Sequence, residues 1–194
     1  KKFNQSILTR RASLRRLSTI KIQEENFQVL DEERNFKIIA EWEYYGFLAL
    51  MDLKDFKNDF QWISEKLGIS TRRAQTVVQD LLAAQLILEK DGVLQKTFKT
   101  LTTTQDVQSV AIKKSHRETL EMAIEKLETV SVDDRFYCSN TIAVTKNNLE
   151  DAKNLVREFR RKLALLLKGE TPDEVYEFSF QLFPITKTIE RNEV

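Results

Sequence analysis

The chain has 194 residues, 31 basic and 30 acidic side chains, a formal net charge of +1 and 41 % hydrophobic residues. Four Gly and two Pro argue against an all-β sandwich or barrel and against Gly/Pro-rich disorder. The single cysteine, Cys138, excludes an intrachain disulfide framework and a cysteine-cluster zinc site, and it suits a reducing compartment. No apolar run approaches the roughly 18 residues of a membrane helix. We therefore expect a helix-rich cytoplasmic protein of one large or two small domains, with no membrane partner.

The near-neutral total conceals an uneven distribution of charge. Residues 1–23 carry seven basic side chains and no acid, whereas residues 24–35 carry five acids and one Arg. Clustered Arg side chains can neutralise nucleic-acid phosphates, but they can equally fold back onto the acidic patch or remain solvated. We treat residues 1–35 as a basic and acidic arm, and we expect it to be the tail of a segment that lies upstream.

Hydrophobic periodicity predicts three helices and a hairpin between residues 36 and 104. The first helix is expected at 35–51, the second at 59–67 and the third at 71–84. Gly68 suits a left-handed helix end, and Ser70 suits the cap of the third helix. The pair Asp91 and Gly92 between two apolar runs predicts a type I′ turn. Helix, helix, short break, helix and hairpin is the order of a winged helix-turn-helix, which we assign to residues 36–104.

The second half of the chain predicts an α-β-α-β domain over residues 105–188, followed by a tail at 189–194. Helices are expected at 106–127 and from 147 or 148 to 168, and strands at 135–145 and 174–186. A helix of about 20 residues returns the chain far enough for the two strands to pair in parallel. Two strands make a poor sheet alone, so we expect a further strand from the same chain or from a second copy. The fold class is thus α+β, helix-rich, and a homodimer is expected.

Several segments share their order and spacing with a known family. They are residues 41–45, 60–69, 115–116, 134–135, 141–144, 175–176 and 181–186. Together they resemble an uncharacterised bacterial family of domain-of-unknown-function proteins, usually regarded as winged-helix transcriptional regulators. The resemblance covers roughly residues 36–188. It implies a regulator, and it implies that a repressor-like segment precedes this part of the chain, with residues 3–5 as its tail.

The sequence departs from the family pattern at two places. A His often follows the aromatic residue where this chain has Tyr45 and Gly46, which puts in doubt any site that needs that His. Gly is common where this chain has Gln85, and the change is expected to affect only the end of the third helix.

Candidate binding residues lie on the third helix and the hairpin. If the helix enters a major groove, Arg72 can read guanine, Gln75 or Gln79 can pair with adenine, and the other polar side chains can fix phosphates. Zero net charge over residues 36–104 favours instead a solvated face on a module that binds protein. The expected DNA-binding residues are Thr71, Arg72, Arg73, Gln75, Thr76, Gln79, Lys90, Lys96 and Lys99.

No constellation of residues predicts an enzyme. His116 is the only histidine, so it lacks a partner for a metal site or a catalytic triad, and we expect it to be partly buried and hydrogen-bonded. Cys138 is expected in the core of a strand. We therefore predict a DNA-binding transcriptional regulator without metal or cofactor, whose C-terminal domain dimerises or senses an unspecified small-molecule or protein effector. The alternative is an interaction or scaffold module of a signalling pathway that uses the winged helix against a protein partner.

Overall fold

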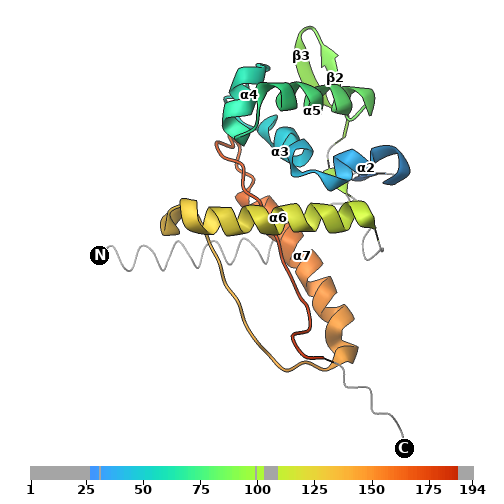
Figure 1. The fold of residues 1–194 in the computed structure, drawn as a ribbon, viewed down its shortest axis with the longest axis vertical. Coiled ribbons are helices and arrows are strands. Elements are labelled where there is room, and N and C mark those ends of the chain that lie inside the picture. Colours follow the sequence, from blue (N-terminus) through green and yellow to red (C-terminus); the bar gives the residue numbers. More distant parts are fainter. Residues whose placement is uncertain (1–26, 31, 99, 103–108, 188–194) are drawn as a thin grey trace, which may run out of the picture.

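The structure, a computed structural model, describes residues 27–30, 32–98, 100–102 and 109–187 (Figure 1). The basic arm at 1–23, most of the acidic patch and the tail at 189–194 lie outside these residues. The longer elements in chain order are α2 (Glu32–Ala40), α3 (Trp42–Leu50), α4 (Phe60–Leu67), α5 (Thr71–Ala83), β2 (Ile87–Lys90), β3 (Val93–Lys96), α6 (Val110–Thr129) and α7 (Leu149–Leu167). Two short strands, β1 (Phe27–Val29) and β4 (Thr100–Thr102), and two single-turn helices, η1 (Val132–Asp134) and η2 (Lys146–Asn148), complete them.

The hydrophobic core lies almost wholly in the first half of the chain. Its buried side chains lie between Leu30, just before α2, and Leu94 of β3, and Ala111 of α6 is the one buried hydrophobic residue beyond Leu94 in the described part. Tyr44 and Phe47 of α3, Ile63 of α4 and Leu81 of α5 are among the largest fully buried side chains. Helix α6 lies along α2 and also contacts α3, so it closes one side of this core (Figure 1).

The helix expected at 35–51 is in fact two helices, so that prediction was wrong in its middle. Glu41 has extended backbone angles, φ −116° and ψ 127°, which separate α2 from α3. Helix α6 provides a hydrogen-bond acceptor at this break, because the Glu118 carboxylate accepts the Trp42 N–H at 3.2 Å. The first turn of α3 thereby gains an acceptor for one of its unpaired N–H groups from a residue 76 positions away.

The predicted second helix, third helix and hairpin are confirmed as elements. Asp59 caps α4 by accepting the Trp62 N–H at 2.7 Å, and α5 spans Thr71–Ala83. Strands β2 and β3 pair antiparallel, with Lys90 opposite Val93. Asp91 and Gly92 between them have φ +53° and +75°, the two positive angles that a type I′ turn requires.

A second pairing was not predicted. Strand β4 lies at the end of the predicted winged helix-turn-helix, and it pairs in parallel with β1, which lies in the residues assigned to the arm. The register joins Phe27 to Thr100 and Val29 to Thr102. The pairing brings the beginning of the described chain next to the segment that follows the hairpin.

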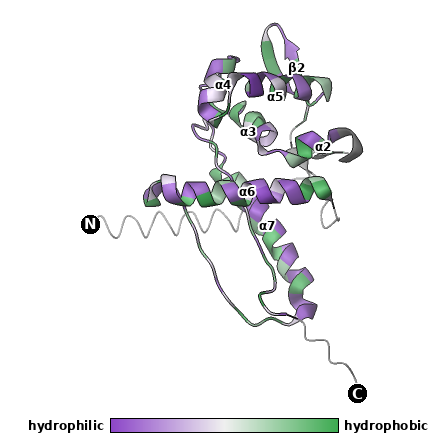
Figure 2. Ribbon diagram, in the orientation of Figure 1, coloured by the Kyte–Doolittle hydropathy of each residue, from purple (hydrophilic) through white to green (hydrophobic). Residues whose placement is uncertain are grey.

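The second half contains the two predicted helices but not the two predicted strands. Residues 135–145 and 174–186 have no strand assignment, and within the described chain they do not pair with each other. In Figure 1 both run from the level of α6 towards the lower end of α7, so their chain directions agree as expected. The prediction of two paired strands was wrong for the described chain, because neither segment forms a strand. Hydrophobic residues remain along both segments and along α7 (Figure 2).

The described chain is a helix-rich α+β structure with small two-stranded sheets. This agrees with the predicted fold class at that level. None of its described helices combines the length and hydropathy that crossing a bilayer requires.

Candidate functional site

The start of α5 is positioned by a short break whose hydrogen bonds are local. Gly68 ends α4 in the left-handed region at φ +68°, and both its N–H and that of Ile69 reach the Ser64 carbonyl. The Ser70 hydroxyl then accepts the Arg73 N–H at 3.1 Å and caps α5. These bonds turn the chain within three residues and fix the direction in which α5 leaves α4.

Helix α5 has one buried and one exposed side. Its buried residues Ala74, Val77, Val78 and Leu81 face α3 and α4. The side chains of Arg72, Gln75 and Gln79 are exposed, and those of Thr76 and Thr71 are half-buried. The predicted residues Arg72, Gln75, Thr76 and Gln79 therefore share one surface, which we call the α5 polar stripe.

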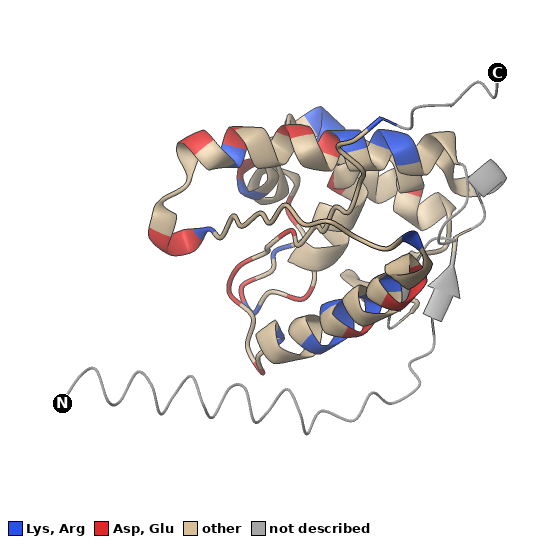
Figure 3. Ribbon diagram, turned by 90° about the horizontal axis from the view of Figure 1, so that it is seen from below, with Lys and Arg blue, Asp and Glu red and all other residues tan. Residues whose placement is uncertain are grey.

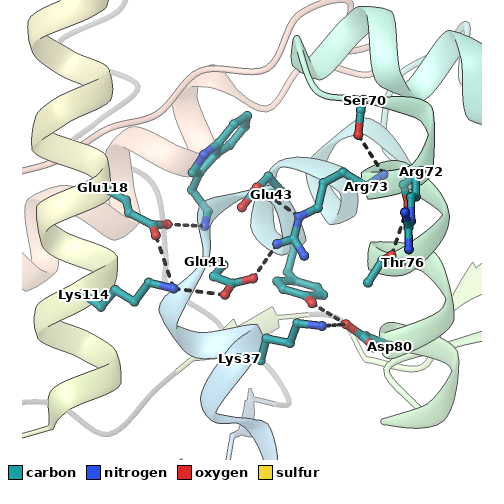
Figure 4. Close-up of polar contacts among 12 residues, drawn as sticks. Lys37, Glu41, Glu43, Ser70, Arg72, Arg73, Thr76, Asp80, Lys114 and Glu118 are labelled. Carbon is teal, nitrogen blue, oxygen red and sulfur yellow. Dashed lines mark hydrogen bonds and ion pairs between the residues drawn. The ribbon is translucent and has the colours of Figure 1, made fainter.

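The polar stripe makes few contacts with the rest of the protein. Thr76 donates its hydroxyl to the Arg72 carbonyl at 3.1 Å, one turn earlier in the same helix (Figure 4). The Arg72, Gln75 and Gln79 side chains make no hydrogen bond or ion pair with any described residue. Thr71 instead lies at the junction with α4, where its hydroxyl donates to Gln61 Oε1 at 3.1 Å.

Arg73 does not belong to the polar stripe, although it neighbours Arg72 in sequence. Its guanidinium turns back to the start of α3 and pairs with Glu41 at 2.5 Å and Glu43 at 3.1 Å (Figure 4). The same group lies over the Tyr44 ring, 5.2 Å from its centroid. Arg73 therefore ties α5 to α3 and is not available at the exposed surface.

Glu41 extends this contact to α6. Lys114 Nζ lies 3.0 Å from Glu41 and 3.5 Å from Glu118, and Glu118 in turn accepts the Trp42 N–H. Burial alone would raise the pKa of Glu41, but the hydrogen bonds from Lys114 and Arg73 hold it below its usual value. We call the set Arg73, Glu41, Glu43, Lys114 and Glu118 the ionic bridge.

A second polar contact lies further along α5. Asp80 accepts a hydrogen bond from the Tyr44 hydroxyl and pairs with Lys37 at 2.7 Å. Burial, followed by the Asp80 carboxylate, raises the pKa of Tyr44 to about 12, so this hydroxyl stays protonated and keeps donating. Although burial opposes it, the bonds from Lys37 and Tyr44 keep the pKa of Asp80 below its usual value. Both ends of α5 are thus fastened to the α2–α3 pair.

The three predicted lysines of the hairpin differ in their surroundings. Lys90 is exposed at the tip of the hairpin and forms no ion pair with a described residue. Lys96 pairs with Asp52 at 2.8 Å, and its side chain is only 19 % exposed. Lys99 lies outside the described residues. The structure therefore brings Lys90, but not Lys96, to the surface as a free cation.

The residues that hold α5 in place were not predicted from the sequence; they are Glu41, Glu43, Asp80, Lys114 and Glu118. Apart from the i,i+4 pair Lys114–Glu118, their contacts join residues 30 or more positions apart and so follow no local period. The expected surroundings of two other residues were wrong. His116 is exposed on α6, and Cys138 is exposed within an unpaired segment, not in a strand core.

Chemistry-bearing side chains do not gather elsewhere in the described part. No three His, Cys, Asp or Glu residues among those that the structure describes lie close enough to hold a metal ion.

No curated protein and no solved structure matches the chain. A family model does match, over residues 21–185, and its description is a domain of unknown function, DUF4423. This agrees with the resemblance found in the sequence, and a match of that length shows that the chain belongs to the DUF4423 family.

Proposed function

We propose that the chain is a DNA-binding transcriptional regulator in which α4, α5 and the β2–β3 hairpin act as a winged helix-turn-helix. The observation that carries the proposal is the α5 polar stripe, which begins at a capped helix start and makes almost no contact with the protein itself. A helix that presents Arg72 in its first turn, followed by Gln75 and Gln79 on the same exposed side, suits insertion into a major groove.

The side chains of the stripe match the edges of bases. Arg72 can donate two hydrogen bonds to guanine, and Gln75 or Gln79 can both donate to and accept from adenine. Thr76 and Thr71 lie beside them, where hydroxyls can reach phosphate oxygens. At the hairpin tip, the exposed Lys90 can contact the backbone on the far side of the groove.

In this proposal the ionic bridge and the stripe have separate roles. Arg73 positions α5 through Glu41 and Glu43 and does not touch DNA. Lys96 has the same kind of role in the hairpin through Asp52. The proposal therefore divides the expected DNA-binding residues into contacts, led by Arg72, and positioning residues, led by Arg73.

We also propose that the regulator acts as a homodimer. A two-fold dimer would present two α5 helices to half-sites about 34 Å apart, one turn of duplex. Each copy would then need only a small number of phosphate contacts, because the second copy repeats them.

A protein-binding role is the second candidate function, and the ion pairs favour it. The pairing of Arg73 and Lys96 with carboxylates leaves Arg72 and Lys90 as the predicted cations that are exposed and unpaired in the described chain. Duplex binding depends chiefly on neutralising phosphates. A module with so few free cations would suit a scaffold that presents the same stripe to a protein.

The test is duplex binding by the full chain and by two charge-reversal variants. Selection from a random-sequence duplex pool supplies the probe, and fluorescence anisotropy at several salt concentrations measures the affinity. We expect Arg72→Glu to weaken binding at least about tenfold and to reduce the salt slope by about one unit. The matched control is Arg117→Glu, which reverses an exposed Arg of α6 that makes no ion pair with a described residue.

Two outcomes would contradict DNA binding through α5. One is that no duplex is enriched by the wild-type chain. The other is that Arg72→Glu and Arg117→Glu weaken binding equally, because the effect would then come from net charge and not from the stripe. Binding of a protein partner that depends on Arg72 without any duplex affinity would support the second candidate.

A further inference from the structure

The second half of the chain leaves an unusual amount of hydrophobic surface uncovered. Most of the exposed large hydrophobic residues of the described chain lie between Val110 and Ile185, while the buried ones lie almost entirely before residue 95. The most exposed include Phe136 at 87 % and Phe183 at 71 %. The first half therefore has a core, whereas the second half has the composition for one but has not formed it.

This surface is concentrated on the two segments that were expected to be strands. Residues 136–144 carry Phe136, Tyr137, Ile142 and Val144 on a non-helical backbone that runs stretched out in Figure 1. Residues 174–185 carry a second set, and all of its members are exposed: Tyr176, Phe178, Phe180, Leu182, Phe183 and Ile185. In this half of the described chain the ring contacts are Phe178 with Phe159 of α7, at 6.0 Å between centroids, and the Arg135 guanidinium over the Tyr137 ring, at 5.5 Å.

The backbone of these segments also makes no backbone hydrogen bonds within the part of the chain that the structure describes. None of the N–H or C=O groups of residues 136–144 or 173–185 bonds to the backbone of a described residue. The second segment is held at its beginning, where the Lys54 N–H donates to the Pro172 carbonyl at 3.0 Å and Val175 packs against the core, and by the contact of Phe178 with Phe159. Extended backbone with free donors and acceptors is a template for pairing with another strand.

The charge pattern shows that the segments are not protected as solvent-facing edges. Native exposed edges usually carry charged side chains, above all Lys, that prevent pairing. Residues 136–145 contain no Lys, Arg, Asp or Glu (Figure 3). In residues 174–186 the charged side chains are Glu174 and Glu177, both within the first four residues, and 178–186 contain none. An uncharged and apolar edge of this length suits burial in an interface.

We infer that the two segments pair with the same segments of a second copy, so that two chains build one shared β-sheet. One chain offers two strands, which is too few for a stable sheet, whereas two copies offer four. The interface would be isologous, since each copy presents the same pair of strands to the other. Helix α7, whose apolar residues Leu155 and Phe159 are exposed, would cover one face of that sheet.

The available area is sufficient for a stable dimer. The six aromatic side chains of the segments are 38 to 87 % exposed. At roughly 150–250 Å² for each ring side chain, they offer on the order of 700 Å² together. A standard stable interface buries about 800 Å² on each partner. The exposed aliphatic side chains of the same segments and of α7 add more than the area that is still needed. A second copy can therefore cover the hydrophobic surface that the chain itself leaves exposed.

The first test measures mass and compares two matched variants of the full chain. Light scattering after size exclusion should give twice the chain mass of 22.8 kDa. Val144→Asp should raise the dimer dissociation constant at least about tenfold, because it places a charge inside the shared sheet. The control is Val93→Asp in the hairpin, where the wild-type residue is 55 % exposed, against 54 % for Val144. Val93→Asp should leave the dimer unchanged.

The second test uses the wild-type protein and needs no variant to fold. Hydrogen exchange should show protected amides at 136–144 and 174–185 in the dimer, because strand pairing satisfies their N–H groups. A monomer at all concentrations would overturn the inference, as would equal effects of the two Val variants. Free exchange of both segments in a dimer would also overturn it. The inference concerns association only, and a dimer without duplex affinity would contradict the proposed function but not the shared sheet.

Discussion

Arg73 is the residue for which the structure makes the most specific energetic prediction. It sits between Glu41 and Glu43, whose side chains are only 20 % and 17 % exposed, and it stacks over Tyr44. Replacing it by Met keeps most of the side chain's length and removes the charge. Two carboxylates would then remain in a partly dehydrated position with one cation fewer.

The expected cost is about 2 kcal/mol of the free energy of unfolding. Removing one member of a fully buried ion pair costs about 3–5 kcal/mol, because the other charge stays uncompensated. The cost is lower here because Glu41 keeps Lys114 at 3.0 Å and both carboxylates retain some solvent. For a chain of this length, about 2 kcal/mol corresponds to a fall in the unfolding midpoint of roughly 4–8 °C.

Urea unfolding followed by tryptophan fluorescence measures this change directly. Trp42 and Trp62 both lie in the helical unit that contains α5, so the signal reports on this unit. The matched control is Arg72→Met, which removes the neighbouring exposed and unpaired guanidinium and should alter stability by less than about 0.5 kcal/mol. A double-mutant cycle with Glu43→Gln should give a coupling energy of about 1 kcal/mol or more.

The reasoning would be refuted if Arg73→Met cost no more than Arg72→Met. That result would mean that water screens the ionic bridge as it screens an ordinary surface pair. Comparing the Arg72 and Arg73 variants also separates an effect on stability from an effect on duplex binding. Under the proposed function, Arg72→Met should weaken duplex binding in a protein of normal stability, whereas Arg73→Met should act mainly through stability.

Two further predictions concern pH and backbone conformation. The bonds from Lys114 and Arg73 hold the pKa of Glu41 in the folded protein below its usual 4.5. As the pH falls, Glu41 is therefore protonated in the unfolded chain before it is protonated in the folded protein. The stability of the wild type should therefore decline below about pH 4.5. Between pH 6 and about pH 3.5, the urea midpoint of Glu41→Gln should fall less than that of the wild type. Equal falls of the two midpoints would contradict this reasoning. Gln85 has φ +57°, a left-handed conformation that glycine adopts without steric cost. Gln85→Gly should stabilise the protein by about 0.5–1 kcal/mol in the same assay, while Gly68→Ala, at φ +68° with open space around it, should destabilise it by about 1 kcal/mol. A destabilising Gln85→Gly together with a neutral or stabilising Gly68→Ala would show that the left-handed angles carry no strain.

The backbone conformation of Gln85 gives a physical reason why glycine is common at this position in the family. The resemblance indicated that Gly is common at this position, and only the end of the third helix was expected to change. The structure gives the reason, because the residue after the Ala84 cap must adopt a positive φ before β2 begins. Tyr45, at the other departure, is largely desolvated, and this desolvation, with a smaller effect of the Glu177 charge, raises its pKa to about 12.

Local sequence was sufficient for the elements whose hydrogen bonds close within a few residues. The end of α4 at Gly68, the cap at Ser70 and the turn at Asp91 and Gly92 were predicted because each depends on the conformational preference or the side-chain oxygen of one or two residues. The alternation of buried and exposed positions on α5 followed from the helical period in the same way.

Only the tertiary structure decided which of these residues are free to act. Arg72 and Arg73 are adjacent and chemically identical, yet Arg73 is bound to α3 because the fold brings Glu41 and Glu43 to it from 30 residues away. The same holds for the break at Glu41, which needs Glu118 of α6, and for the segments at 135–145 and 174–186, which have strand sequences but no partner within the described chain. Hydrophobic periodicity indicates which secondary structure a segment can adopt. Ion pairs and strand pairing depend on groups that are distant in sequence, and the positions of these groups are set only when the chain has folded.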